Sequence, residues 1–215
     1  MEQLVEKRLT ELLFEGSREL GLDLEEGQAR LLVRYLDLLL TWNRKVNLTS
    51  VTEPERAVEM HLLDSLPAKR LLEGVGSVVD LGAGGGLPGI PLAIVLPDLQ
   101  VTMVDTVGKK VGFLKAAIAG LGLKNAKAVH ARAEGNPERE GIPVADCAIC
   151  RAFMAPQEWV ELASPYIKVG GRVLAMLGAE TEVPAELPGG FRQREELEYR
   201  LPRSKAVRRV VSFSR

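Results

Sequence analysis

The feature that most constrains the fold is the alternation of short apolar runs with helix-like stretches in the second half of the chain. The apolar runs are predicted strands at residues 78–81, 101–104, 126–130, 144–150 and 172–177, and helical patterns lie at 91–96, 111–121 and 160–166. Such alternation is typical of βαβ units, in which helices cover both faces of a mostly parallel sheet. We therefore expect an α/β, Rossmann-like fold.

Both ends of the chain differ from this pattern. Two further strands are predicted at residues 193–201 and 207–213, and the short segment between them requires an antiparallel hairpin. Leucines at helical spacing predict helices over residues 2–20, 25–42 and 54–66, whose apolar stripes must pack on something else. We divide the chain into a helical extension at 1–73, packed on the core, and a sheet domain at 74–215.

Composition excludes several classes of protein. The chain is 46% hydrophobic and 27% charged, which is typical of a globular core and not of a disordered chain. No apolar run is long enough to cross a membrane, and the first residues match neither a secretory signal nor a transit peptide. Two cysteines cannot form a disulfide framework, so we expect a cytoplasmic protein that does not bind membranes.

Charge is distributed unevenly. Residues 1–75 hold 10 Lys and Arg against 14 Asp and Glu, whereas residues 192–215 hold 8 against 3. Since the whole chain has a formal charge of only −1, contact with nucleic acid must come from a local basic patch. The same basic residues are also typical of an exposed hairpin that avoids edge-to-edge aggregation.

A glycine-rich loop follows the first predicted strand. Gly84, Gly86 and Gly89 have the G-x-G-x-x-G spacing of dinucleotide-binding proteins, although a structural turn would also use glycine. Asp80 precedes the loop, where a carboxylate repels a pyrophosphate but can hold a cationic amino group. Asp105 ends the next strand and is placed to accept hydrogen bonds from a ribose. These acidic residues favour S-adenosylmethionine over NAD as the cofactor.

Other reactive side chains have simpler interpretations. Cys147 and Cys150 lie three apart in a predicted strand, so they should point to opposite faces and share neither a disulfide nor a metal. We assign no metal site. His61 falls on an apolar helical stripe and is expected to be buried, and Trp42 is expected to join the helical region to the sheet. His130 lies at a strand end, so it is expected to lie at most at the edge of a ligand pocket.

Five blocks of sequence resemble a known family. They are WNRKVNLTSV at 42–51, HLLDSL at 61–66, DLGAGGGLPGIPLAI at 80–94, DTVGKKVGFL at 105–114 and CRAFMAP at 150–156. Together with the glycine loop and the terminal hairpin, they resemble the bacterial ribosomal RNA small subunit methyltransferase G family, also called the glucose-inhibited division protein B family. This is a family of class I S-adenosylmethionine-dependent methyltransferases, and it methylates the N7 of one guanine in 16S rRNA.

The resemblance implies a methyltransferase domain at 74–215 and a set of cofactor contacts. With the acidic residues and glycines already singled out, the expected cofactor-binding residues are Asp80, Gly82, Gly84, Leu87, Asp105, Ala133, Glu134 and Arg151. Guanine N7 presents a lone pair and no proton, so we assign no catalytic base. N7 is poorly accessible in an A-form helix, so the acceptor base should be unpaired or extruded.

The expected partner is 16S rRNA or the small ribosomal subunit, and nothing in the sequence demands more than a monomer. The candidate RNA-binding residues are Asn47, Lys109, Lys110, Arg203, Lys205 and Arg208. Asn43 and Asn47 either cap the turn that follows or contact RNA. One departure concerns the position before Gly178, where the family commonly has lysine and this chain has Leu177.

Two other functions remain open from the residues alone. The G-x-G-x-x-G spacing is compatible with a nicotinamide-dependent oxidoreductase. A non-catalytic RNA-binding module on a methyltransferase scaffold would have the same fold.

Overall fold

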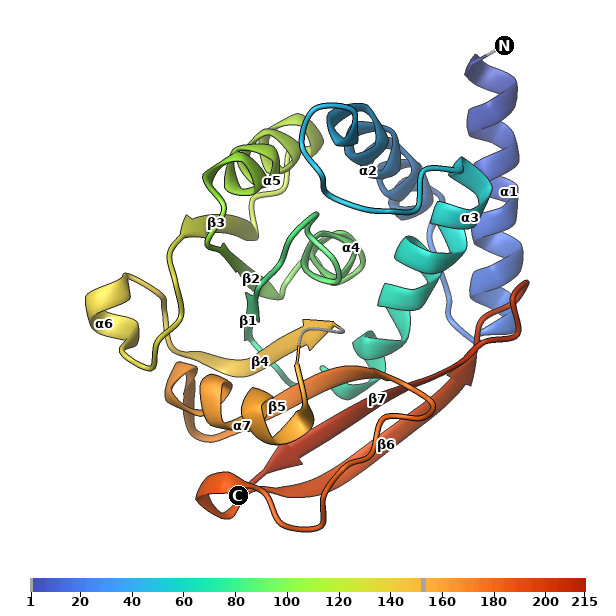
Figure 1. Cartoon of the computed structure of the whole chain (residues 1–215). Coiled ribbons are helices and arrows are strands. Elements are labelled where there is room, and N and C mark those ends of the chain that lie inside the picture. The colour runs from blue at the N-terminus through green and yellow to red at the C-terminus, as the bar shows by residue number, and fades with distance from the viewer. Residues whose placement is uncertain (1, 152–153) are drawn as a thin grey trace.

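A computed structural model describes residues 2–151 and 154–215. The centre of the molecule is a seven-stranded sheet of order β3-β2-β1-β4-β5-β7-β6 (Figure 1). The strands are β1 (Ser77–Leu81), β2 (Gln100–Asp105), β3 (Ala126–His130), β4 (Ala145–Arg151), β5 (Ile167–Gly178), β6 (Arg192–Arg200) and β7 (Val207–Ser214). The first five are parallel, and β7 pairs antiparallel with both β5 and β6. The predicted Rossmann-like sheet with a terminal antiparallel hairpin is confirmed.

Helices cover the two faces of the sheet unequally. One face carries α1 (Glu2–Glu19), α2 (Glu26–Asn43), α4 (Gly89–Val95) and α5 (Gly108–Leu121), and the other carries α7 (Pro156–Ala163) (Figure 1). A short α6 (Pro137–Glu140) lies between β3 and β4. The larger core contains Leu36 and Leu39 of α2 together with Ile90 of α4 and Leu114 of α5. Residues 2–73 therefore share one hydrophobic core with the sheet.

The third predicted helix is a composite of three helical types. It begins as α3 (Pro54–Ala57), becomes a π-helix at η1 (Val58–Leu63) and ends as a 3₁₀ helix at η2 (Leu66–Leu71). The apolar stripe predicted a continuous helix, because spacing alone does not distinguish an α turn from a wider π turn. The π segment lies beside the carboxyl end of β4, where the Met60 carbonyl oxygen accepts from Arg151.

Strand β5 begins earlier than predicted. Ala145 pairs with Ile167 and Cys147 pairs with Arg172, so residues 168–171 form a bulge within the strand. Gly170 has φ = +77°, and a Cβ on Gly171 would lie 2.8 Å from the Asp146 carbonyl oxygen. The two glycines therefore permit a bulge inside the strand, whereas the strand was predicted to begin only at residue 172.

The predicted placement of the cysteines and of Trp42 is confirmed. Cys147 packs in the core on the α4 side of the sheet, and Cys150 packs in the core on the α7 side. Half-buried Trp42 contacts Phe113 of α5 with ring centroids 5.8 Å apart, which joins α2 to the helices covering the sheet. Among the helices that the structure describes, none is long and apolar enough to cross a membrane.

Candidate active site

The glycine loop connects β1 to α4 at the point where the strand order reverses, with β2 on one side of β1 and β4 on the other. Ligands of open α/β sheets bind at such points, beyond the carboxyl ends of the strands. Gly82 is exposed and Gly84 is half-buried, whereas residues 85–89 are buried. A Cβ on Gly84 would meet only the Gly82 carbonyl oxygen, at 3.9 Å. The outer side of Gly84 is therefore open to a ligand.

The glycines further along the loop serve packing. A Cβ on Gly86 would lie 2.7 Å from Ile90 Cδ1, and one on Gly89 would lie 2.6 Å from Met103 Cγ. These contacts belong to the core of the protein. The last two glycines of the G-x-G-x-x-G spacing are thus explained without a dinucleotide.

Most N–H groups of this loop already donate hydrogen bonds within the protein. Those of Gly82 and Ala83 donate to the Val104 carbonyl oxygen, and those of Gly86 and Leu87 donate to the Ala83 carbonyl oxygen. Gly84 donates to Asp105 and Gly89 donates to Asp80. A pyrophosphate site needs N–H groups that are free to donate. Because carboxylates occupy two of these donors, the loop fits a cationic cofactor better than an anionic one.

Asp105 lies at the end of β2, beside Gly84. Its Oδ2 accepts from the Gly84 N–H at 2.9 Å and its Oδ1 accepts from the Val107 N–H at 2.8 Å. An ionised carboxylate accepts about four hydrogen bonds. Each oxygen of Asp105 therefore retains a lone pair, and its contact with a ribose hydroxyl stays a prediction.

Asp80 is more deeply buried than its predicted role suggested. Its Oδ2 accepts from the Gly89 N–H at 3.0 Å, at the start of α4, and the side chain is 1% exposed. Burial raises the pKa of Asp80 to about 7. The observed contact fixes the loop to α4, and a direct contact with a cofactor amino group stays a prediction.

Leu87 is also buried, whereas Ala133 and Glu134 follow β3 at the same rim as Asp105. The Glu140 carboxylate holds their loop by accepting from the N–H groups of Glu134 and Asn136 at 3.0 Å. Burial opposes ionisation of Glu140, but the Tyr166 hydroxyl and these N–H groups outweigh it and lower its pKa. The sequence analysis did not single out Glu140 or Tyr166.

Arg151 lies at the carboxyl end of β4, on the other side of β1 from Asp105. Its Nη1 donates to the Met60 carbonyl oxygen at 2.8 Å and to Asp64 Oδ2 at 3.4 Å. Asp64 also accepts from the Tyr199 hydroxyl at 2.9 Å, and Arg208 Nε lies 3.7 Å from its Oδ1. The structure therefore gathers two arginines around one buried carboxylate, which lies within the HLLDSL block but was not selected from the sequence.

Three of the candidate RNA-binding residues, Asn47, Lys109 and Lys110, lie outside the terminal hairpin. Lys109 and Asn47 are exposed, and Lys110 is half-buried beside Lys109 at the start of α5. The cap on the turn after α2 comes from Asn43, which accepts from the N–H groups of Leu48 and Thr49.

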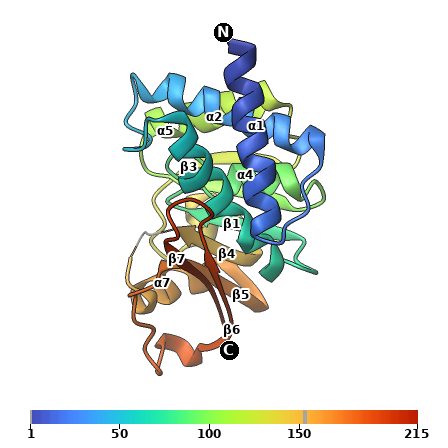
Figure 2. The same cartoon turned by 90° about the vertical axis from the view of Figure 1, so that its right-hand side faces the viewer.

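The three candidate RNA-binding residues of the hairpin have acidic partners within the chain. Arg203 Nη1 lies 2.9 Å from Glu55 Oε2, and Lys205 Nζ lies 3.6 Å from Glu19 Oε2. Figures 1 and 2 show the hairpin tip beside α1 and α3. Arg208 was expected as an exposed residue of the hairpin, but it is only 27% exposed and faces Asp64. The acidic and basic ends of the sequence therefore neutralise each other in part.

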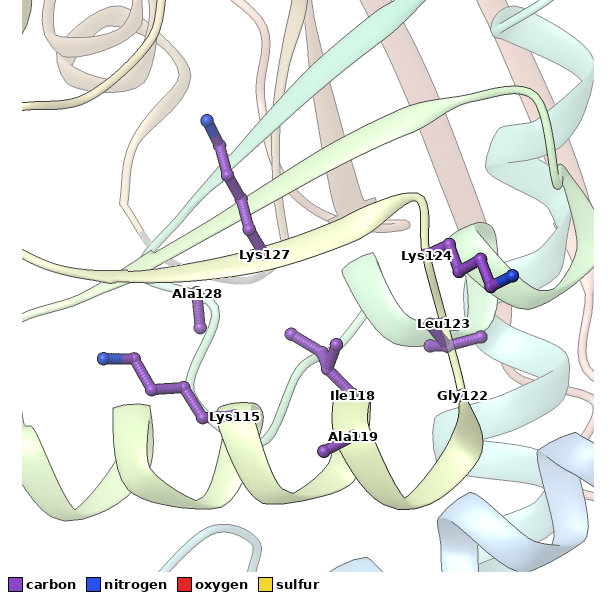
Figure 3. Close-up of a pocket in the computed structure, with 8 residues that line it drawn as sticks. All are labelled: Lys115, Ile118, Ala119, Gly122, Leu123, Lys124, Lys127 and Ala128. Carbon is purple, nitrogen blue, oxygen red and sulfur yellow. The ribbon is translucent and has the colours of Figure 1, made fainter.

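A separate cavity of about 480 Å³ lies between α5 and β3, lined by lysines and small apolar residues (Figure 3). The side chains of Lys115, Lys124 and Lys127 point in different directions, so their ammonium groups do not converge on a ligand (Figure 3). This cavity lies toward the amino end of β3, away from Asp105. It is not the candidate active site.

Comparison with known proteins identifies the family. The model of the rRNA small subunit methyltransferase G family matches residues 28–188. A ribosomal RNA small subunit methyltransferase G from Myxococcus xanthus (strain DK1622) is 47% identical over 213 residues, covering 97% of this chain and 98% of the relative. One from Anaeromyxobacter dehalogenans (strain 2CP-C) is 46% identical, covering 95% and 97%. This chain belongs to the rRNA small subunit methyltransferase G family.

Two solved structures are similar in fold to this chain. TrmN from Thermus thermophilus has a TM-score of 0.51 at 20% identity, covering 74% of this chain and 53% of that protein. A single-residue mutant of MtNAS in complex with S-adenosylmethionine has a TM-score of 0.57 at 16% identity, covering 87% and 77%.

Membership in the methyltransferase G family confirms an enzyme that uses S-adenosylmethionine, and the nicotinamide-dependent alternative is dropped. The loop geometry fits this cofactor, since Gly84 and Asp105 can line its site. Within residues 2–151 and 154–215, no cluster of three His, Cys, Asp or Glu side chains is arranged to hold a metal ion.

Proposed function

We propose that this chain transfers a methyl group from S-adenosylmethionine to the N7 of one guanine in 16S rRNA. The cofactor is assigned to the Gly82–Gly84 side of the loop, with Asp105 accepting from its ribose and Ala133 and Glu134 beside its base. Arg151 is assigned to the boundary between cofactor and acceptor. When bound, S-adenosylmethionine supplies a methyl group on a sulfonium whose thioether leaving group needs no proton.

The observation that supports this chemistry best is the arrangement of polar groups across β1. Acidic acceptors lie on the β2 side of the switch point, and a pocket with paired arginines lies on the β4 side. Guanine N7 has no proton to lose. The protein therefore needs only to position the base and to stabilise the charge that develops during methyl transfer. Neither role requires a general base.

The same proposal places the enzyme in the cytoplasm, where small-subunit rRNA is found, and has it act as a monomer. Candidate contacts to RNA are Asn47, Lys109 and Lys110 near the active site. Arg203 and Lys205 are weaker candidates because Glu55 and Glu19 compete for them.

Methyl transfer from tritiated S-adenosylmethionine tests the proposal. Naked 16S rRNA and 30S subunits are incubated separately with the protein, and digestion to nucleosides identifies the product as 7-methylguanosine. Primer extension after aniline cleavage then maps the base. Tritium at another nucleoside would overturn the N7 assignment, and absence of tritium from both substrates would overturn 16S rRNA as the substrate.

A further inference from the structure

The cavity beside Arg151 has the size and lining of a small-ligand site. It measures about 430 Å³ and lies at the carboxyl ends of β4 and β5, between the π-helical segment η1 and the terminal hairpin. Met60, Met176 and Leu177 supply apolar walls, and Asp64, Arg151 and Arg208 supply charge. Binding pockets commonly have volumes of about 300–1,000 Å³ with a few placed polar groups. A single nucleobase fits these properties.

Among the described residues that line this cavity, Asp64 is the only one with a carboxylate. Its side chain is 8% exposed, and Tyr199, Arg151 and Arg208 hold it from three elements. Tyr199 and Arg151 use one lone pair on each oxygen, and Arg208 Nε lies too far away for a hydrogen bond. A carboxylate offers about four acceptor positions, so Asp64 retains an acceptor position on each oxygen.

The π-helical segment explains how Asp64 reaches this position. Asp64 directly follows η1, and the Met60 carbonyl oxygen within η1 accepts from Arg151 at 2.8 Å. A π turn rotates the following side chains relative to an α-helix, and such turns are frequent at functional sites. Here the π turn supports both the carboxylate and the arginine beside it.

We propose that Asp64 binds the Watson–Crick edge of the acceptor guanine in this cavity. The inference rests on the proposed function and names the residue that selects guanine. Guanine presents two neighbouring donors on this edge, its N1–H and its 2-amino group, which match the two oxygens of a carboxylate. Adenine has an acceptor at N1, which a carboxylate repels.

This mode of binding also suits the methyl transfer. N7 lies on the opposite edge of guanine, so a base held through N1 and the 2-amino group keeps its N7 lone pair uncovered. That lone pair forms the new C–N bond while the C–S bond breaks and its electrons stay on sulfur. The N1 proton stays on the base, which becomes cationic. A carboxylate beside N1 binds this cation more strongly than neutral guanine and thus stabilises the transition state.

Inosine at the mapped position tests the inference, because inosine keeps N7 and N1–H but lacks the 2-amino group. With the natural-sequence protein, kcat/KM for inosine RNA should fall about 10- to 100-fold, as expected for one lost hydrogen bond to a charged group. In Asp64→Asn, an amide N–H₂ faces the 2-amino group, so the preference for guanosine should disappear or reverse.

Tyr199→Phe is the matched control. It removes the hydroxyl that holds Asp64 but keeps the carboxylate, so guanosine should still be preferred. Thermal unfolding verifies that both variants fold, and if Asp64→Asn does not fold, Asp64→Ser, which also lacks the carboxylate, takes its place. Equal methylation of guanosine and inosine RNA would overturn the inference while leaving the proposed function intact. No methylation of guanosine RNA would instead refute the proposed function.

Discussion

At the scale of single residues, the two carboxylates beside the glycine loop occupy different environments. Asp80 is 1% exposed and fixes the start of α4. Asp105 is 7% exposed and lies at the end of β2, with one unused lone pair on each carboxylate oxygen. The sequence places both aspartates at strand ends beside the loop, but Asp80 has a structural contact and Asp105 has lone pairs that a ligand can use. Asp105 is the better residue for testing cofactor binding.

We expect Asp105→Ala to weaken S-adenosylmethionine binding about 10- to 150-fold, because a carboxylate makes charge-assisted hydrogen bonds to the ribose. Titration calorimetry measures the loss. Asp146→Ala is the control, since Asp146 lies at the amino end of β4 and pairs with Lys168. Equal cofactor affinity in Asp105→Ala and the natural-sequence protein would remove Asp105 from the site.

His61 is predicted to make stability depend on pH. Burial, followed by the charge of Arg151, lowers its pKa to about 4 from the ordinary 6.5. Between pH 6.5 and 4, His61 is therefore protonated in the unfolded chain and neutral in the folded chain. The free energy of unfolding consequently decreases as pH falls from 6.5 toward 4. The full loss is about 3 kcal/mol at about 1.4 kcal/mol per unit.

Asp80 partly masks this effect, because its raised pKa makes stability fall in the opposite direction, as pH rises from about 4 toward 7. The test is thus a comparison of urea unfolding for His61→Gln and the natural-sequence protein at each pH. The stability of the variant relative to the natural sequence should increase as pH falls below 6.5. A constant difference between pH 4 and 7 would show that His61 is not held neutral by the fold.

At the scale of elements, the first turn of α5 is the clearest basic feature near the active site. Lys109 and Lys110 begin the helix that follows Asp105, and no ion pair engages them among the described residues. In contrast, the hairpin residues that were candidates for RNA binding, Arg203, Lys205 and Arg208, are each paired with an acidic group. RNA contact is therefore expected at α5 more than at the hairpin.

The double variant Lys109→Ala/Lys110→Ala should lower rRNA affinity and flatten its salt dependence. Two lost phosphate contacts reduce the slope of log affinity against log salt by about 1.4 for single-stranded RNA. Filter binding between low and physiological salt measures this slope. Lys124→Ala/Lys127→Ala makes the same change in charge at the amino end of β3, and an equal loss of slope there would indicate nonspecific attraction.

At the scale of the whole molecule, residues 2–73 and the sheet share one core, and Tyr35 of α2 donates to the Gly85 carbonyl oxygen in the glycine loop. Hydrogen bonds from the Arg203 and Ser204 N–H groups to Glu59 join the hairpin to the same helices. We therefore expect the chain to unfold as one unit, although the sequence divides at about residue 73.

The two tryptophans measure this cooperativity, because Trp42 lies on the α5 side of the sheet and Trp159 lies in the core on the other side. Trp42→Phe and Trp159→Phe each leave one reporter. In each variant, the urea midpoint from fluorescence should equal the midpoint from far-ultraviolet circular dichroism. A Trp42 signal that changes before the circular dichroism signal would show that residues 1–73 unfold separately.

The features that depend on the order of residues along the chain could be predicted before the structure was known. Strand and helix periodicities predicted the parallel sheet, and the position of the glycine loop after a strand predicted the cofactor side of the site. Asp105 could be selected because it ends the next parallel strand, and such strand ends meet at one rim. The family blocks added the remaining cofactor residues.

The pairing of charged side chains could not be predicted from the sequence, because the partners are far apart along the chain. Asp64 is separated by 87 residues from Arg151 and by 135 from Tyr199, and Arg203 is separated by 148 from Glu55. Periodicity reports the environment of a residue along its own element, but it contains no information on which distant side chain will face it. Arg208 therefore looked like a solvated hairpin residue, whereas β7 inserts between β5 and β6 and turns it toward Asp64. The cavity around Asp64 therefore depends on how the chain brings η1, β4, β6 and β7 together, and no single segment predicts it.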